Sequence, residues 1–119
     1  MSYFKLEEFQ CKCGKCPVRP VDPVLLNRLE GLRSKYGKAI YITSGWRCEP
    51  YNTQVGGAPD SAHLDGQAAD LFCTSSRDRY NLLSNAIGLF HRIGIGTTFV
   101  HVDVSTSHQQ ELIWLYGIH

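Results

Sequence analysis

Long apolar runs are missing from this chain of 119 residues. Nowhere do about eighteen consecutive apolar residues occur, which is the length that a transmembrane helix needs, so we expect no transmembrane segment. The chain also lacks an excess of charge of one sign, since 12 Lys and Arg nearly balance 11 Asp and Glu and the formal net charge is +1. A chain so close to neutral offers no electrostatic case for binding nucleic acid or an anionic membrane surface.

The first residues, Met-Ser-Tyr-Phe-Lys-Leu-Glu-Glu-Phe, lack the apolar stretch of a secretory signal peptide. We therefore expect synthesis in the cytoplasm without a signal peptide. Internal repeats, low-complexity tracts and linkers are lacking as well, and the 43% of hydrophobic residues is ordinary for a globular protein. The length suits a single domain over residues 1–119 that buries about two-thirds of its unfolded surface.

The five cysteines are unevenly spread. Cys11, Cys13 and Cys16 crowd together, whereas Cys48 and Cys73 lie far along the chain. An odd number excludes a fully paired set of disulfides within one chain. The Cys-x-Cys-x2-Cys run with a fourth ligand could hold a structural zinc ion, although four-cysteine sites usually show two separated pairs. Because cytosolic thiols stay reduced, thiols or an opportunistic disulfide are favoured over such a zinc site, and the choice stays open.

The predicted elements follow one another as in a small α+β domain. Asp22 can cap a helix whose first residue is Pro23, and Gly37 can end it. A second helix is expected from Ser75 or Ser76 onward. The segments with β-branched or apolar character predict strands over 39–43 and 67–73, and one or two more within 94–104.

The second helix is expected to bury one face at helical spacing, formed by Tyr80, Leu83, Ile87 and Phe90. Residues 45–66 carry four glycines and two prolines without a clear period, so they predict a long loop of the kind that is usually functional. Because only loops and one helix separate the strands, we expect an α+β domain with a small, mostly antiparallel sheet and flanking helices.

Metal-ligand residue types stand near the second and the last predicted strands. His63 and Asp70 are seven residues apart, and His101 lies on the later strand. Two histidines and a carboxylate form a three-ligand zinc site with an open fourth position, the pattern of a catalytic zinc. Zinc in such a site lowers the pKa of its water from 15.7 to about 7 and so supplies a nucleophile for a peptide carbonyl. We therefore predict that His63, Asp70 and His101 bind one zinc ion.

The surroundings of these residues support that prediction. A His and an acid at this spacing occur by chance in roughly a third of such chains, so the spacing alone is weak. Asp70, however, interrupts an apolar run, where a buried carboxylate is costly without a cation or strong donors. On the later strand, alternation puts His101 and Asp103 on one face and Val100 and Val102 on the other.

Further residues complete a known pattern. The stretch from Ser61 to Asp70 reads Ser-x-His-x2-Gly-x-Ala-x-Asp. Upstream stand Thr-Ser-Gly-Trp-Arg over 43–47, Tyr-Asn over 51–52 and Val-Gly-Gly over 55–57. With these residues the chain resembles, from about Phe4 to Asp103, the zinc D-Ala-D-Ala carboxypeptidase family. That family includes phage L-Ala-D-Glu endolysins and vancomycin-resistance dipeptidases, and hedgehog signalling domains share its fold.

The resemblance implies a hedgehog-type fold and a zinc metallopeptidase that hydrolyses the stem peptides of bacterial peptidoglycan. It also implies that Arg47 lies beside the zinc ion and holds a polarised carbonyl or a substrate carboxylate, since the planar guanidinium suits either anion. Ser61 is expected to contact the substrate or to steady the loop. The resemblance leaves open whether the activity is that of a D-Ala-D-Ala carboxypeptidase or of an L-Ala-D-Glu endopeptidase.

The proton-transfer group is where the chain departs from the family pattern. Many relatives place Asp or Glu three residues before the last histidine ligand, where this chain has Thr98. Asp103 is the nearest replacement, and we expect it to transfer the proton or, alternatively, to orient His101. Asp65 and His108 are weaker candidates.

The missing acid keeps a second class of function open, a non-catalytic, zinc-stabilised module that binds a cell wall or a protein. A third hypothesis, a cysteine-centred metal or redox module, depends on the three clustered cysteines alone. For the leading hypothesis we expect a monomer whose partner is a peptidoglycan peptide. Such a protein would reach the cell wall after phage-type release or as part of a larger particle.

Overall fold

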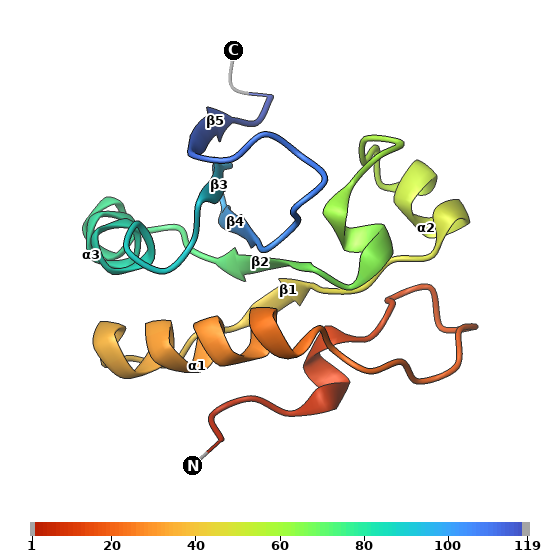
Figure 1. The fold of residues 1–119 in the computed structure, drawn as a ribbon, viewed down its shortest axis with the longest axis horizontal. Helices are drawn as coiled ribbons and strands as arrows, with labels where there is room; N and C mark the ends of the chain where they lie inside the picture. The colour runs from red at the N-terminus through yellow and green to blue at the C-terminus, as the bar shows by residue number, and fades with distance from the viewer. Residues whose placement is uncertain (1, 118–119) are drawn as a thin grey trace.

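The computed structural model describes residues 2–117 and shows an α+β fold (Figure 1). Its elements are two short 3-10 helices, three α-helices and five strands. In chain order they are η1 (Leu6–Phe9), α1 (Pro23–Tyr36), β1 (Ile42–Ser44), α2 (Glu49–Gln54), η2 (Ala62–Asp65), β2 (Ala68–Phe72), α3 (Ser76–Ala86), β3 (Arg92–Ile95), β4 (Phe99–Asp103) and β5 (Leu112–Leu115).

The five strands form one sheet in the order β1-β2-β4-β3-β5. The β1/β2, β2/β4 and β3/β4 pairs are antiparallel, and β5 pairs with β3 in parallel. The expected α+β class with a small, mostly antiparallel sheet is thereby confirmed. Among the described residues, no helix has the length and apolar character needed to cross a membrane.

The hydrophobic core lies between one face of the sheet and the helices α1 and α3, which contact each other (Figure 1). Leu25, Leu29 and Leu32 of α1 are almost fully buried against Leu71, Val100 and Val102 of the central strands. Burial of apolar surface contributes about 25 cal/mol per Å² to the free energy of folding, so this layer is the main source of stability. The opposite face of the sheet is left free for other side chains.

Helix α1 has the bounds that its end signals predict. The carboxylate of Asp22 accepts a hydrogen bond from the backbone N–H of Val24 at 2.8 Å, and Pro23 takes the first helical position. Gly37 ends the helix in the left-handed conformation at φ 77°. A Cβ would be strained at that φ, so glycine is the suitable residue there.

The expected loop over 45–66 contains more regular structure than its composition indicates. Cys48 occupies the N-cap position of α2 without a side-chain capping bond, a proline stands in the first turn of α2, and the side chain of Ser61 caps η2. Both helices are too short for a helical period to be visible in the sequence, which is why the segment was expected to be irregular. The first strand is also shorter than the predicted 39–43 segment, since β1 begins only at Ile42.

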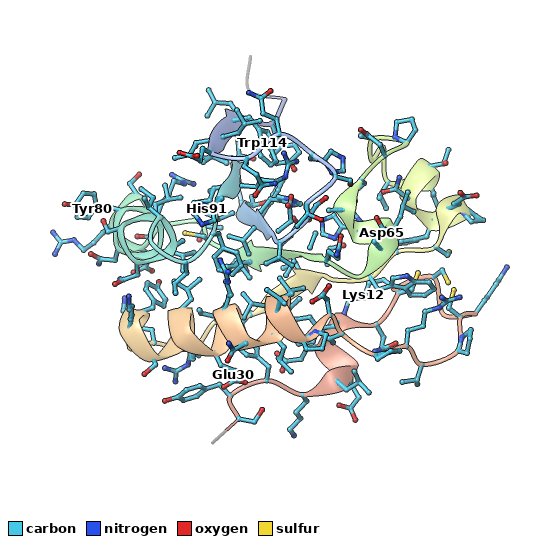
Figure 2. All side chains as sticks on the ribbon, in the orientation of Figure 1. Lys12, Glu30, Asp65, Tyr80, His91 and Trp114 are labelled. Atoms are coloured by element: carbon cyan, nitrogen blue, oxygen red, sulfur yellow. The ribbon has the colours of Figure 1, made fainter. Side chains whose placement is uncertain are left out.

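The expected buried face of the second helix is wrong in part. Tyr80 and Ile87 are exposed, and Figure 2 shows Tyr80 pointing away from α3. Leu82 and Ala86 are buried instead, one turn apart on the side that meets α1. Because leucines stand at both 82 and 83, the sequence is compatible with either of two buried faces. Packing against α1 selects the face that contains Leu82.

Candidate metal centre

His63 is positioned by a short turn that is fixed at both ends. Ser61 Oγ accepts a hydrogen bond from the backbone N–H of His63 at 3.2 Å. Gly66 ends the turn in the left-handed conformation at φ 69°, which side chains with a Cβ rarely adopt. The turn holds the imidazole of His63 next to Asp70, where the residue is 2% exposed.

The register of two central strands brings the other two predicted ligands together. Asp70 of β2 is paired with His101 of β4. As the alternation along β4 predicts, Val100 and Val102 join the hydrophobic core. His101 therefore points to the free face of the sheet, on the same side as Asp70.

Two imidazole nitrogens converge on one carboxylate oxygen at this place. Asp70 Oδ1 lies 3.2 Å from His63 Nε2 and 2.9 Å from His101 Nδ1. All three side chains are buried, and one ligand atom from each lies within 4.8 Å of the other two. We refer to His63, Asp70 and His101 as the metal triad.

The second nitrogen of each imidazole has an acceptor of its own. His63 Nδ1 lies 2.6 Å from the carbonyl oxygen of Gly45, and His101 Nε2 lies 2.8 Å from Oδ2 of Asp103. Both partners are acceptors, so each of these nitrogens carries a proton and donates it. With those protons in place, His63 Nε2 and His101 Nδ1 are the nitrogens left to bind a cation beside Asp70. Three acceptor atoms that meet in a buried site fit a cation, and this donor set is typical of zinc.

Electrostatics act differently on the three side chains of the metal triad. Burial lowers the pKa of His63, which favours the neutral imidazole that a metal requires. Burial lowers the pKa of His101 too, but its hydrogen bonds to Asp103 and Asp70 outweigh burial and raise that pKa. Burial raises the pKa of Asp70, and hydrogen bonds from His101 and His63 outweigh it, so this pKa lies far below its usual range. Asp70 is thus ionised and draws positive charge toward itself.

Arg47 borders the metal triad through the second oxygen of Asp70. Its Nη2 lies 3.1 Å from Asp70 Oδ2, and its Nε donates to Ser44 Oγ at 2.9 Å. Its Nη1 donates to Asn52 Oδ1 at 3.2 Å. With three partners on different sides, the guanidinium is held in one orientation at the edge of the site.

Asn52 and Gly57 explain part of the upstream motif in physical terms. Asn52 is 2% exposed, and its Nδ2 donates to the carbonyl oxygen of Ala58 at 2.9 Å while its Oδ1 holds Arg47. A Cβ at Gly57 would overlap Asn52 Oδ1 and crowd Arg47 Nη1. Glycine at this position therefore leaves the space in which Asn52 positions the arginine.

Asp103 contacts the ring nitrogen of His101 that faces away from Asp70. Its Oδ2 accepts from His101 Nε2, while its Oδ1 accepts from Arg92 Nε at 2.8 Å and from the backbone N–H of Ser105 at 3.1 Å. Burial raises the pKa of Asp103, but the hydrogen bond with His101 and the charges of His101 and Arg92 outweigh it and lower that pKa. Both oxygens of this 2% exposed carboxylate thus already have partners.

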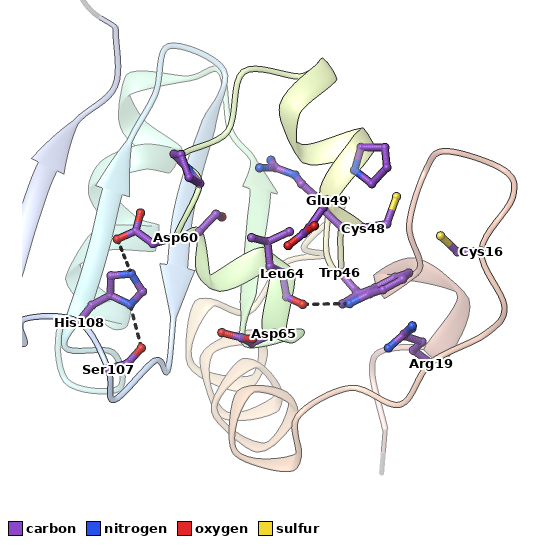
Figure 3. A pocket seen from close by; sticks show the side chains of 14 residues that line it. Cys16, Arg19, Trp46, Cys48, Glu49, Asp60, Leu64, Asp65, Ser107 and His108 are labelled. Atoms are coloured by element: carbon purple, nitrogen blue, oxygen red, sulfur yellow. Dashed lines mark hydrogen bonds and ion pairs between the residues drawn. The ribbon is translucent and has the colours of Figure 1, made fainter.

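A cavity of about 340 Å³ opens over the metal triad. It adjoins a larger and more open groove of about 730 Å³, which Figure 3 shows from close by. Four residues line both hollows: Arg47, Asp60, Ser61 and His108. The two hollows are therefore adjacent, and the open groove leads to the cavity over the triad.

The candidates for proton transfer lie at different distances from this cavity. Thr98 stands before β4 at the far end of the β2/β4 pair, where its carbonyl oxygen accepts from Cys73 N, and it does not line the cavity. Asp65 lines only the open groove. His108 lines both hollows, and its Nε2 lies 3.3 Å from Asp60 Oδ2 (Figure 3).

An aromatic wall on β5 and just beyond it was not predicted from the sequence. The rings of Trp114 and Tyr116 have centroids 5.5 and 5.9 Å from that of His101. Gly94 faces His101 across the β3/β4 pair, and a Cβ there would overlap the Tyr116 ring. A glycine inside a strand signals such a close approach, so Gly94 was the available hint.

Tyr116 and Arg92 complete this side of the cavity. Burial raises the pKa of Tyr116 to about 12, so its hydroxyl stays protonated and can donate a hydrogen bond. The Arg92 guanidinium lies 4.9 Å from the centroid of the Trp114 ring and donates to the carbonyl oxygen of Gln109 at 2.7 Å. Arg92 thus ties the aromatic wall to the carboxylate that orients His101.

Comparison with known proteins places this geometry in a family. A family model described as Peptidase M15 matches residues 2–103, which include the metal triad, Arg47 and Asp103. No curated protein matches the chain. The family match covers most of the chain and agrees with the resemblance noted in its motifs. The chain therefore belongs to the peptidase M15 family of metallopeptidases.

Proposed function

We propose that the protein is a zinc peptidase that hydrolyses the stem peptides of bacterial peptidoglycan. It would cleave either the D-Ala-D-Ala bond, as a carboxypeptidase, or the L-Ala-D-Glu bond, as an endopeptidase. One observation carries the proposal: one ligand atom each from His63, Asp70 and His101 lies within 4.8 Å of the other two, at the floor of an open cavity. Family membership supports peptidase chemistry, and the motif resemblance supports the substrate class.

The metal triad would hold the zinc ion. When bound, zinc acts as a Lewis acid that polarises a carbonyl and lowers the pKa of a water toward about 7. Trp114 and Tyr116 shield the triad from bulk water on one side, and the protonated hydroxyl of Tyr116 can donate to a substrate oxygen.

Arg47 would bind the negative charge of the substrate. A guanidinium has five N–H donors, and its contacts with Asp70, Ser44 and Asn52 use three of them. Two donors remain for a carboxylate or for a carbonyl that gains charge. A charge-assisted bond of this kind contributes about 1.5–3 kcal/mol. Ser61, which lines the same cavity, would contact the substrate and also steady the turn that carries His63.

Asp103 and His108 would have separate roles, one in orienting His101 and the other in proton transfer. Because both oxygens of Asp103 already have partners, the contacts favour its alternative role of orienting His101. The Asp60–His108 pair lines the cavity and is more accessible, so we assign proton transfer to this pair.

The test is incubation of zinc-loaded protein with purified peptidoglycan and with synthetic stem peptides, followed by mass spectrometry. We expect new peptide ends with the wild type, and the same ends with His91→Ala, whose exposed imidazole lies outside the cavity. His63→Ala is expected to release none. If no new ends arise with zinc supplied, the peptidase proposal fails and a zinc-stabilised binding module replaces it.

A further inference from the structure

Four cysteines meet at a second place, away from the metal triad. Three belong to the segment between η1 and α1, and the fourth occupies the N-cap position of α2: they are Cys11, Cys13, Cys16 and Cys48. Their Sγ atoms all lie within 4.8 Å of one another, and each residue is partly buried. Figure 3 shows Cys16 across from Cys48. We refer to these four residues as the cysteine cluster.

The spacing of the sulfur atoms is that of a metal site. Cys11 Sγ lies 3.7 Å from Cys48 Sγ, and Cys13 Sγ lies 3.4 Å from Cys16 Sγ. Sulfur atoms at about 2.3 Å from a tetrahedral zinc are about 3.8 Å apart. A disulfide bond would need about 2.05 Å. The two measured distances are thus close to that spacing, and the remaining ones, all within 4.8 Å, leave the four sulfur atoms near enough to share one ion.

Backbone N–H groups contact two of the sulfur atoms in the cysteine cluster. The N–H of Lys15 donates to Cys13 Sγ at 3.4 Å, and the N–H of Cys48 donates to Cys11 Sγ at 3.5 Å. Gly14 takes the left-handed conformation at φ 79°, which turns the chain between Cys13 and Cys16. Lysines at 12 and 15 add positive charge next to the sulfur atoms.

The segment that carries three of these cysteines has little else to hold it. Residues 10–20 contain no helix or strand, and none of their side chains is fully buried. The side chain of Gln10 ties the two ends of the segment through the backbone of Arg19, and Arg19 lies over the Trp46 ring at 4.3 Å. A segment without an apolar core of its own needs a cross-link to keep one conformation.

We propose that the cysteine cluster binds a structural zinc ion through four thiolates. Four protein ligands leave no open position, so this ion has no place for a substrate or a water. It fastens residues 10–20 to the start of α2, directly after Arg47, and so supports the wall of the open groove to which Cys16, Arg19 and Cys48 contribute. The protein would then hold two zinc ions of different kinds, one catalytic and one structural.

The proposal is tested by the metal content of protein purified under reducing conditions, measured by mass spectrometry of the elements. We expect about two zinc ions per chain in the wild type and about one in Cys16→Ser. Cys73→Ser is the matched control, since Cys73 lies outside the cysteine cluster, and it should keep about two. His63→Ala should keep only the zinc of the cysteine cluster, so failure at one site is distinguishable from failure at the other.

A second measurement does not depend on a cysteine variant that folds. His63→Ala reconstituted with cobalt should show thiolate-to-cobalt charge-transfer bands, because its cysteines are intact. Two results would overturn the proposal: a cobalt spectrum without those bands, or a wild type with a single zinc that His63→Ala loses entirely. Intramolecular disulfides among the four cysteines after reducing purification would also overturn it, in favour of a redox role.

Discussion

The two metal-ligand groups of this protein differ in what positions them. The metal triad stands on the sheet: the register of β2 with β4 pairs Asp70 with His101, and a capped turn brings His63 to them. The cysteine cluster stands on an irregular segment and on the first residue before a short helix. Strand pairing and the core hold the first group, whereas sulfur contacts are the main link within the second.

This difference separates function from stability. A preformed, buried triad with a free coordination position is suited to catalysis, because its ligands need no reorganisation when a substrate arrives. A four-thiolate site on a poorly packed segment is suited to folding, because the metal supplies the order that packing does not. Substitutions at the two groups should therefore change different measured quantities.

The largest effect is expected from Asp70→Asn. The amide keeps the shape of the side chain but loses the negative charge that faces both imidazoles and Arg47. A metal site that supplies about 4 kcal/mol of transition-state stabilisation would lose about a thousandfold in kcat/KM. Peptide cleavage assays measure this loss, and the metal content should fall by one zinc while the zinc of the cysteine cluster stays. Retention of more than a tenth of the activity would contradict a catalytic role for the triad.

Removal of the cysteine site should mainly affect stability. For Cys16→Ser we expect the thermal unfolding midpoint to fall by roughly 10 °C, the shift produced by about 2 kcal/mol in a domain of this size. Hydrogen exchange should show the loss of protection in residues 10–20 and at the start of α2. An unchanged midpoint with a lost zinc would mean that the segment is held by something other than the ion.

Asp103→Asn distinguishes the two roles considered for this carboxylate. If Asp103 orients His101, zinc affinity at the triad should fall by about 10–100-fold, as is usual when the partner of a metal-bound histidine is changed. The measurement is a competition titration with a zinc chelator, together with the pH profile of kcat/KM. A variant with unchanged zinc affinity but a lost acidic limb of the pH profile would assign proton transfer to Asp103 instead, because a general base with a lowered pKa titrates on that limb.

The smallest effect is expected from Gly57→Ala. The added methyl group displaces Asn52, which then no longer holds Arg47 Nη1. Loss of one such orienting bond, worth about 1 kcal/mol, predicts a decrease of about fivefold in kcat/KM with zinc content unchanged. Gly88→Ala is the control, because a Cβ at that position meets open space. Equal activity of the two variants would remove Asn52 from the account of the site.

Local signals predicted much of the fold. Asp22, Pro23 and Gly37 gave the bounds of α1, because capping is decided within a few residues of the helix end. Period-two alternation along β4 separated His101 from the valines of the core. The strand β5 was missed, since four residues paired in parallel at the edge of the sheet carry almost no pattern of their own.

Long-range contacts account for the rest. Nothing near Cys48 in the sequence indicates that it joins the cysteines of the N-terminal segment, because the path of the chain through β1 brings it there. Likewise, Asn52 and Arg92 reach the site only because the loop and the sheet fold in a way that brings them there. Such residues orient others, and their roles depend on packing that a single sequence does not display.

Anomalous X-ray scattering at the zinc absorption edge, from crystals of protein purified with zinc, tests the account most directly. We expect one peak between His63 Nε2, Asp70 Oδ1 and His101 Nδ1, and a second peak among the four sulfur atoms of the cysteine cluster. Absence of the first peak in zinc-saturated crystals would contradict the central claim that these three side chains form the catalytic metal centre.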